Sequence, residues 1–117
     1  MAGGDYNVGA DSPVTTIVSV RDGLAFRLRA PKPPGQYPDG ADKAGFPVEI
    51  YSGGSLKDGG PFCELELLGP VKLTRAGQGW RHTMRWDLSR LANPDVDSEA
   101  QKAEVKALLT EAQPTAP

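Results

Sequence analysis

Residues 80–88 read WRHTMRWDL and alternate between two kinds of side chain. One face carries the large and mainly apolar residues Trp80, His82, Met84, Trp86 and Leu88. Because successive side chains of a strand point to opposite faces, this pattern predicts a β-strand with one buried face. We therefore expect Trp86 to lie in a core, and Trp80 in a core or a subunit interface.

A hairpin is predicted in the N-terminal part of the chain. Residues 14–20 are an alternating, β-branched run, and residues 24–29 are a second alternating run. Asp22-Gly23 stands between them, and Asp-Gly between two such runs is a strong hairpin signal.

Shorter strands are predicted at 47–51, 62–68 and 71–73, and the last two are expected to form a meander with 80–88. After Asn93-Pro94 the apolar spacing becomes helical, which predicts a helix over 97–110 with Asp97 or Ser98 as its cap. The sequence thus predicts an all-β fold, a mostly antiparallel β-sandwich of about six strands, with one C-terminal α-helix. The expected organisation is a flexible lead-in at 1–12, a single domain over 13–112 and a frayed tail at 113–117.

Composition excludes several classes of protein. The formal net charge is −2, which argues against a nucleic-acid binder held by charge. No apolar run approaches the length of a membrane span, and no signal peptide is visible, so we expect a soluble, cytoplasmic protein without a membrane partner. Cys63 is the single cysteine, which excludes an intramolecular disulfide and a multi-cysteine zinc site. No metal and no cofactor is predicted.

The stretch 62–73, FCELELLGPVKL, is followed by a Gly77-Gln78 turn and by the strand that ends in Trp86-Asp87-Leu88. This arrangement resembles the closing strands of galactose-mutarotase-like β-sandwich proteins, especially their uncharacterised bacterial relatives. Those proteins carry a Glu-containing strand, a proline, and a last strand that ends in an aromatic residue and a leucine. The resemblance extends over residues 5–90, and 62–88 carries most of it.

The resemblance implies a sugar site in which a glutamate acts as general base, a role that falls on Glu64 or Glu66 here. The family's members are much longer, so this chain is expected to correspond to their C-terminal part. The histidines that assist as acid in the family have no upstream counterpart, because His82 is the single histidine of the chain. A complete mutarotase site is therefore not expected.

Glu64 and Glu66 are the candidate site residues of the sequence itself, because residues two apart in a strand project from one face. Two such carboxylates can share acid–base work, hold a hard cation or bind sugar hydroxyls. Arg81 and Arg85 are predicted to lie beside them and complete a ligand-binding face. The alternative is ordinary cross-strand pairing of these glutamates and arginines, worth about 0.2–1 kcal/mol per pair.

His82 is expected to be a core or interface residue, and Cys63 a buried, inert thiol. Three functions remain open: a non-catalytic carbohydrate-binding or accessory module, a sugar-processing enzyme of mutarotase type with a site completed across subunits, and an interaction protein without a small ligand. A partial sandwich leaves one apolar face uncovered, so we also expect a homodimer.

Overall fold

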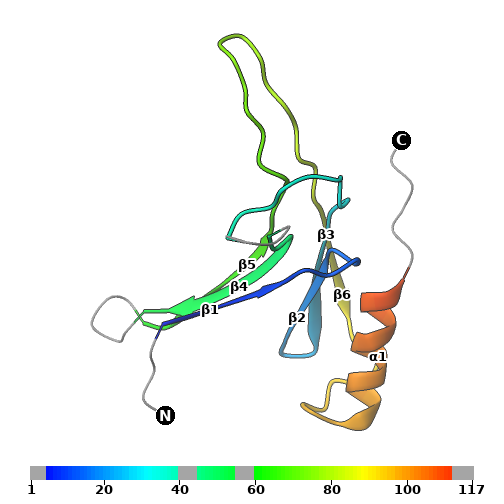
Figure 1. The fold of residues 1–117 in the computed structure, drawn as a ribbon. Coiled ribbons are helices and arrows are strands. Elements are labelled where there is room, and N and C mark those ends of the chain that lie inside the picture. Colours follow the sequence, from blue (N-terminus) through cyan, green and yellow to red (C-terminus); the bar gives the residue numbers. More distant parts are fainter. Residues whose placement is uncertain (1–4, 40–44, 55–59, 112–117) are drawn as a thin grey trace. The chain divides into compact units, whose positions relative to one another are not determined.

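A computed structural model describes residues 5–39, 45–54 and 60–111 (Figure 1). The chain divides into two compact units: Met1–Pro13 with Lys32–Trp80, and Val14–Pro31 with Arg81–Pro117. Each unit contains one three-stranded antiparallel sheet. The predicted fold class is confirmed, because the described residues form six antiparallel strands in two sheets and one C-terminal helix. The expectation of a single domain over 13–112 stays a prediction.

The sheet of the first unit has the order β1-β4-β5, with strands Tyr6–Ala10, Val48–Gly53 and Phe62–Leu67. β4 is central, and its Val48 lies opposite Leu67 of β5, where both side chains are buried. Gly9 of β1 lies under the Phe46 ring, since a Cβ added there would fall 2.4 Å from that ring. The segment 1–12, predicted to be a flexible lead-in, contains the strand β1. This strand forms because it pairs antiparallel with β4, a partner that no local pattern in the sequence indicates.

The sheet of the second unit has the order β2-β3-β6, with strands Thr16–Arg21, Leu24–Arg29 and Arg85–Arg90. The predicted hairpin is confirmed: Asp22 and Gly23 both have positive φ, 52° and 73°, as a two-residue type I′ turn requires. A Cβ on Gly23 would also meet the Pro94 ring at 3.1 Å.

The helix α1, Glu99–Thr110, packs on β2. Ser98 is its N-cap, and the Ser98 hydroxyl accepts a hydrogen bond from the Gln101 amide at 3.1 Å. The Glu104 carboxylate accepts bonds from the backbone amides of Ala92 and Asn93, at 2.9 and 3.0 Å. These bonds fix the turn that leads from β6 into the helix, and they lower the pKa of Glu104.

Three predictions about the C-terminal strands are wrong. Val71-Lys72-Leu73 is not a strand, and the strand predicted at 80–88 begins at Arg85. The meander is absent as well, because β5 pairs with β4 whereas β6 pairs with β3. β3 supplies the reason for the late start of β6, since it ends at Arg29 opposite Arg85 and continues into Ala30-Pro31, which cannot extend the ladder.

The prediction that Trp86 lies buried in a core is also wrong, whereas a subunit interface for Trp80 and Trp86 stays a prediction. Trp86 is 67% exposed, Leu88 is 68% exposed, and Trp80 is exposed too. Trp86 lies opposite Leu28, which is buried. Leu28 belongs to the central strand and is flanked on both sides, whereas Trp86 belongs to the outer strand and contacts the Phe26 ring edge to face. Alternation correctly predicts which side chains share a face, but it does not say whether that face is covered.

Candidate functional site: an acidic sheet face

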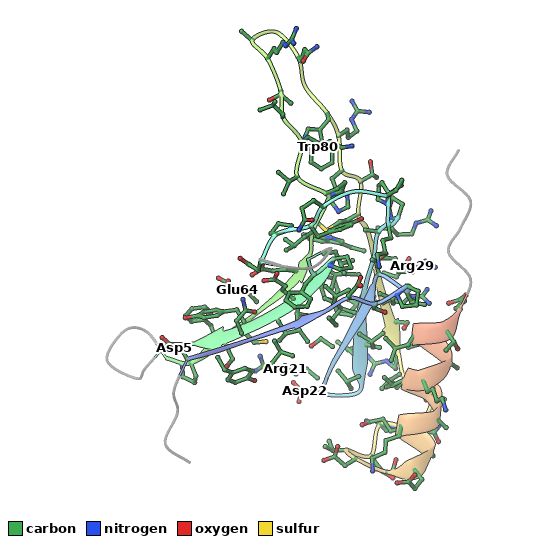
Figure 2. The ribbon with its side chains drawn as sticks, viewed as in Figure 1. Asp5, Arg21, Asp22, Arg29, Glu64 and Trp80 are labelled. Carbon is green, nitrogen blue, oxygen red and sulfur yellow. The ribbon has the colours of Figure 1, made fainter. Side chains whose placement is uncertain are left out.

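The two glutamates of β5 face the same side of the β1-β4-β5 sheet, as the sequence predicts. Glu64 lies opposite Tyr51, and Glu66 lies opposite Glu49, both on β4. Asn7 of β1 lies opposite Tyr51 on the other side of that strand. We call Asn7, Glu49, Tyr51, Glu64 and Glu66 the acidic face; Figure 2 shows the side chains of this sheet, with Glu64 labelled.

Glu49 is the most deeply buried member of the acidic face, with 3% of its surface exposed. Its Oε2 accepts a hydrogen bond from Asn7 Nδ2 at 3.1 Å. Its Oε1 is buried and has no hydrogen-bond partner among the described residues. A buried acceptor without a donor destabilises the fold by about 1–3 kcal/mol, and most buried polar atoms in proteins have a hydrogen-bond partner. Glu49 Oε1 is therefore an exception, whereas Oε2 of the same side chain has a donor.

Glu66 is half-buried beside two other carboxylates. Burial raises the pKa of Glu66, and so do the charges of Glu49 and Glu64, a hydrogen bond shared with Glu64, and the charge of Asp39. The fold therefore stabilises the protonated form of Glu66 relative to the unfolded chain, and a protonated Glu66 can donate to Glu64. The acidic face thus combines a hydrogen-bonded pair of carboxyl groups with one fully buried acceptor.

Aromatic rings lie at one end of the acidic face. Tyr51 and Phe62 have ring centroids 5.7 Å apart, and their planes are inclined by 48°. Phe62 is on the same face of β5 as Glu64 and is exposed. Burial raises the pKa of Tyr51, and Asp5 and Glu64 raise it further by their charges and, for Asp5, by a hydrogen bond. The tyrosine therefore stays a neutral hydroxyl that can donate or accept.

The predicted cross-strand pairing of Glu64 and Glu66 with Arg81 and Arg85 is wrong. The cross-strand neighbours of Glu64 and Glu66 come from β4, whereas Arg85 lies on β6 opposite Arg29 of β3. Arg81 and Arg85 both belong to the second compact unit, whereas the glutamates belong to the first. The role of these arginines in ligand binding stays a prediction.

The second unit contains a charge cluster that the sequence reasoning missed. Arg29 donates to Asp87 Oδ2 from Nε and Nη2, at 3.1 and 2.6 Å, and Arg27 approaches the same oxygen at 3.4 Å. Arg27 also pairs with Glu111 and donates to the carbonyl of Leu108 at 3.2 Å, so it ties the end of α1 to the sheet. The cluster stabilises the packing of α1 on the sheet. The alternation in the sequence indicates only that the arginines and Asp87 lie on polar faces.

Two further sequence candidates receive no chemical role. Cys63 is exposed, so the prediction of a buried thiol is wrong; it lies opposite Ser52, on the face of the sheet away from the glutamates. His82 is half-buried. Within residues 5–39, 45–54 and 60–111, no group of three His, Cys, Asp or Glu side chains is placed to hold a metal ion. No helix in that part of the chain has the length and apolarity needed to cross a membrane.

Asn7, Glu49 and Tyr51 are the residues of the acidic face that the sequence reasoning missed. A signal for Glu49 exists, because it is a charged residue between Val48 and Ile50 on a strand that is otherwise apolar at its start. Asn7 has no such signal, since it lies in a segment whose strand partner is distant in the sequence.

No family model, no curated protein and no solved structure matches the chain. The resemblance to galactose-mutarotase-like proteins therefore stays a prediction drawn from the residues at 62–88.

Proposed function

We propose that the protein is a non-catalytic carbohydrate-binding or accessory module, and that the acidic face is its binding surface. The observation that carries the proposal is the unpartnered Glu49 Oε1, buried at the base of the face. A sugar hydroxyl that donates to this oxygen would remove the penalty of the buried acceptor, and binding would require the side chains that cover the oxygen to move aside. Binding sites of this kind place a few polar groups that orient the ligand.

The remaining members of the acidic face suit a polyol. Asn7 and Tyr51 supply neutral amide and hydroxyl groups, and Glu64 and Glu66 supply further acceptors. The exposed Phe62 ring beside Tyr51 offers an apolar surface for the C–H side of a pyranose. An anionic ligand is disfavoured, because the acidic face carries Glu49, Glu64 and Glu66 and no basic side chain.

A catalytic version of the same site is the second candidate. The observation that favours it is the hydrogen bond between Glu64 and Glu66, since two carboxyl groups within hydrogen-bond reach can pass a proton in acid–base catalysis. In this version Glu64 or Glu66 is the base of a mutarotase-type reaction, and a second subunit supplies the acid. The binding module is preferred, because it requires no group from outside the acidic face.

The test is a chemical-shift titration of the chain with a panel of monosaccharides and short oligosaccharides. The proposal predicts saturable shifts that are lost in Glu49→Gln and in the double variant Glu64→Gln/Glu66→Gln. Glu99→Gln is the matched control, because Glu99 is a 91% exposed glutamate side chain on α1. Arg81→Gln and Arg85→Gln test in the same assay whether the predicted arginines take part.

The same spectra report exchange between the α and β anomers of an aldose. Exchange accelerated by the wild-type chain and lost in Glu64→Gln or Glu66→Gln would establish the catalytic version. No shift and no exchange with any sugar would refute both and would leave a protein that acts through interactions alone.

We also propose that the chain is a homodimer, as the sequence predicts. The exposure of Trp86 and Leu88 on one sheet face supports association, because large apolar side chains gathered on a surface mark interaction sites.

A further inference from the structure

β6 is an outer strand of its sheet in the described part of the chain, and it combines a free edge with an exposed apolar face. The strand order β2-β3-β6 leaves one side of β6 without a partner strand there. Trp86 and Leu88 project from the face that also carries Phe26. An outer strand of this kind is a template for pairing with another strand.

The register determines which backbone groups of β6 point outward. The two-residue turn at Asp22-Gly23 makes Arg21 and Leu24 a hydrogen-bonded pair, so the N–H and C=O of Arg27 point toward β6. Arg27 lies opposite Asp87, and the backbone groups of Asp87 therefore point inward. The bond from the Leu91 amide to the Gly23 carbonyl, 2.9 Å, agrees with this parity. The groups at even-numbered positions, including Trp86 and Leu88, point outward.

From this edge we infer that β6 pairs antiparallel with β6 of a second copy, about a two-fold axis at Trp86. The inference deepens the proposed homodimer by naming its surface, and it is independent of the sugar site on the other sheet. In this register Trp86 lies opposite its own copy, Met84 lies opposite Leu88, and Arg85 lies opposite Asp87. Each unlike pair occurs twice, since an interface about a two-fold axis is self-complementary.

Charge selects this register over its neighbours. The nearest registers that keep outward groups opposite outward groups are those about Asp87 and about Arg85, and they would place Asp87 or Arg85 opposite its own copy. Pairing about Leu88 would leave Arg85 opposite Leu91 and remove the contact with Asp87. Opposite charges directly across two strands stabilise the pair, whereas like charges destabilise it.

The inference also accounts for the alternation at 80–88. That pattern is suited to a strand, yet residues 81–84 belong to none, because β3 ends opposite Arg85. In the proposed register Thr83 and Met84 lie opposite Ser89 and Leu88 of the second copy, so the strand pattern extends beyond Arg85 along the second copy. The occupant is a second copy because the segment supplies its own complement of charge and apolar side chains.

Sedimentation of the full chain at about 50 µM provides the first arm of the test. The inference predicts a species near 25 kDa, twice the 12.4 kDa of one chain. Trp86→Ser and Leu88→Ser should each shift the species to the monomer. Val96→Ser is the control and should stay dimeric, because Val96 is an 81% exposed apolar residue outside the sheet. A monomeric wild-type chain, or a dimer that neither β6 substitution weakens, would overturn the inference.

Cysteine cross-linking tests the register and does not depend on the folding of the Trp86 variant. In a Cys63→Ser background, Thr83→Cys and Ser89→Cys chains should form a disulfide-linked dimer when mixed, since the register places these positions opposite one another within about 6 Å. Neither variant alone should cross-link. Cross-linking of either alone, or none in the mixture, would contradict the register. Sugar titration of Leu88→Ser separates the two proposals, because loss of the dimer should leave binding at the acidic face intact.

Discussion

Glu49 lies directly opposite Glu66 across β4 and β5, with the Glu49 carboxylate buried and the Glu66 carboxyl group half-buried. Burial raises the pKa of Glu66, and the neighbouring charges of Glu49 and Glu64 raise it further. The acidic face therefore contains two neighbouring carboxyl groups and an unpartnered Glu49 oxygen. Both features make it less stable than an apolar face of the same shape would be.

The raised pKa of Glu66 predicts a pH dependence of stability. A carboxyl group whose pKa is higher in the folded state contributes stability that is fully present below its unfolded pKa, which is about 4.5. That contribution is lost as the pH rises through the folded pKa. Glu66→Gln should therefore be more stable than wild type at pH 7 and should show a flatter profile above pH 4.5. Denaturant melts from pH 4 to 8 provide the measurement, and an unchanged profile would contradict the assignment.

The lowered pKa of Asp87 predicts the opposite dependence of stability on pH. Burial alone would raise the pKa of Asp87, but the hydrogen bond and charge of Arg29, with the charges of Arg27 and Arg85, together outweigh burial and lower it. The stability from Asp87 is thus present above its unfolded pKa of about 3.8 and is lost as the pH falls through the lower folded value.

Asp87→Asn should consequently destabilise the fold by about 1–3 kcal/mol at pH 7, because buried Arg29 loses its charged acceptor. The difference from wild type should shrink at low pH. Thermal melts at pH 7 and pH 3 check both statements, and an equal difference at the two pH values would be inconsistent with the cluster.

The substitution Gly9→Ala should create a steric clash with the Phe46 ring. A Cβ at Gly9 would lie 2.4 Å from the Phe46 ring, so the ring must shift, and overpacking of this kind destabilises by about 1–3 kcal/mol. Gly79→Ala is the matched control, since a Cβ there meets nothing within 4 Å. Denaturant unfolding of the two variants should separate them, and equal midpoints would show that Phe46 does not cover Gly9.

Trp86→Ala should change the stability of the monomer by no more than about 1 kcal/mol, because the side chain is 67% exposed and packs edge to face on the Phe26 ring. A buried tryptophan would instead cost about 3–5 kcal/mol. Unfolding at a concentration low enough to populate the monomer makes the comparison, and a loss in the larger range would show that Trp86 belongs to a core.

Local signals in the sequence predict the local structure well. The Asp22-Gly23 turn, the Ser98 cap and the strand pattern around Glu64 and Glu66 all depend on neighbouring residues, and the structure contains each of them. The placement of Glu64 and Glu66 on one face follows from strand geometry alone.

The misses concern partners that are distant in the sequence. β1 is a strand because β4 pairs with it, and β6 begins at Arg85 because β3 ends opposite that residue. Neither pairing can be inferred from the few residues around each strand. Exposure of Trp86 reflects its place on an outer strand, which alternation does not report. The burial of Glu49 likewise depends on tertiary packing, so the sequence indicated only Glu64 and Glu66 of the acidic face.

The most direct test of sugar binding at the acidic face is residue-resolved mapping of amide shifts during titration with a sugar that binds. The account predicts that the largest saturable shifts fall on Asn7, Glu49, Tyr51 and 62–66, and that Glu49→Gln abolishes them while Glu99→Gln does not. Shifts that gather elsewhere in the chain, or that persist unchanged in Glu49→Gln, would contradict the account.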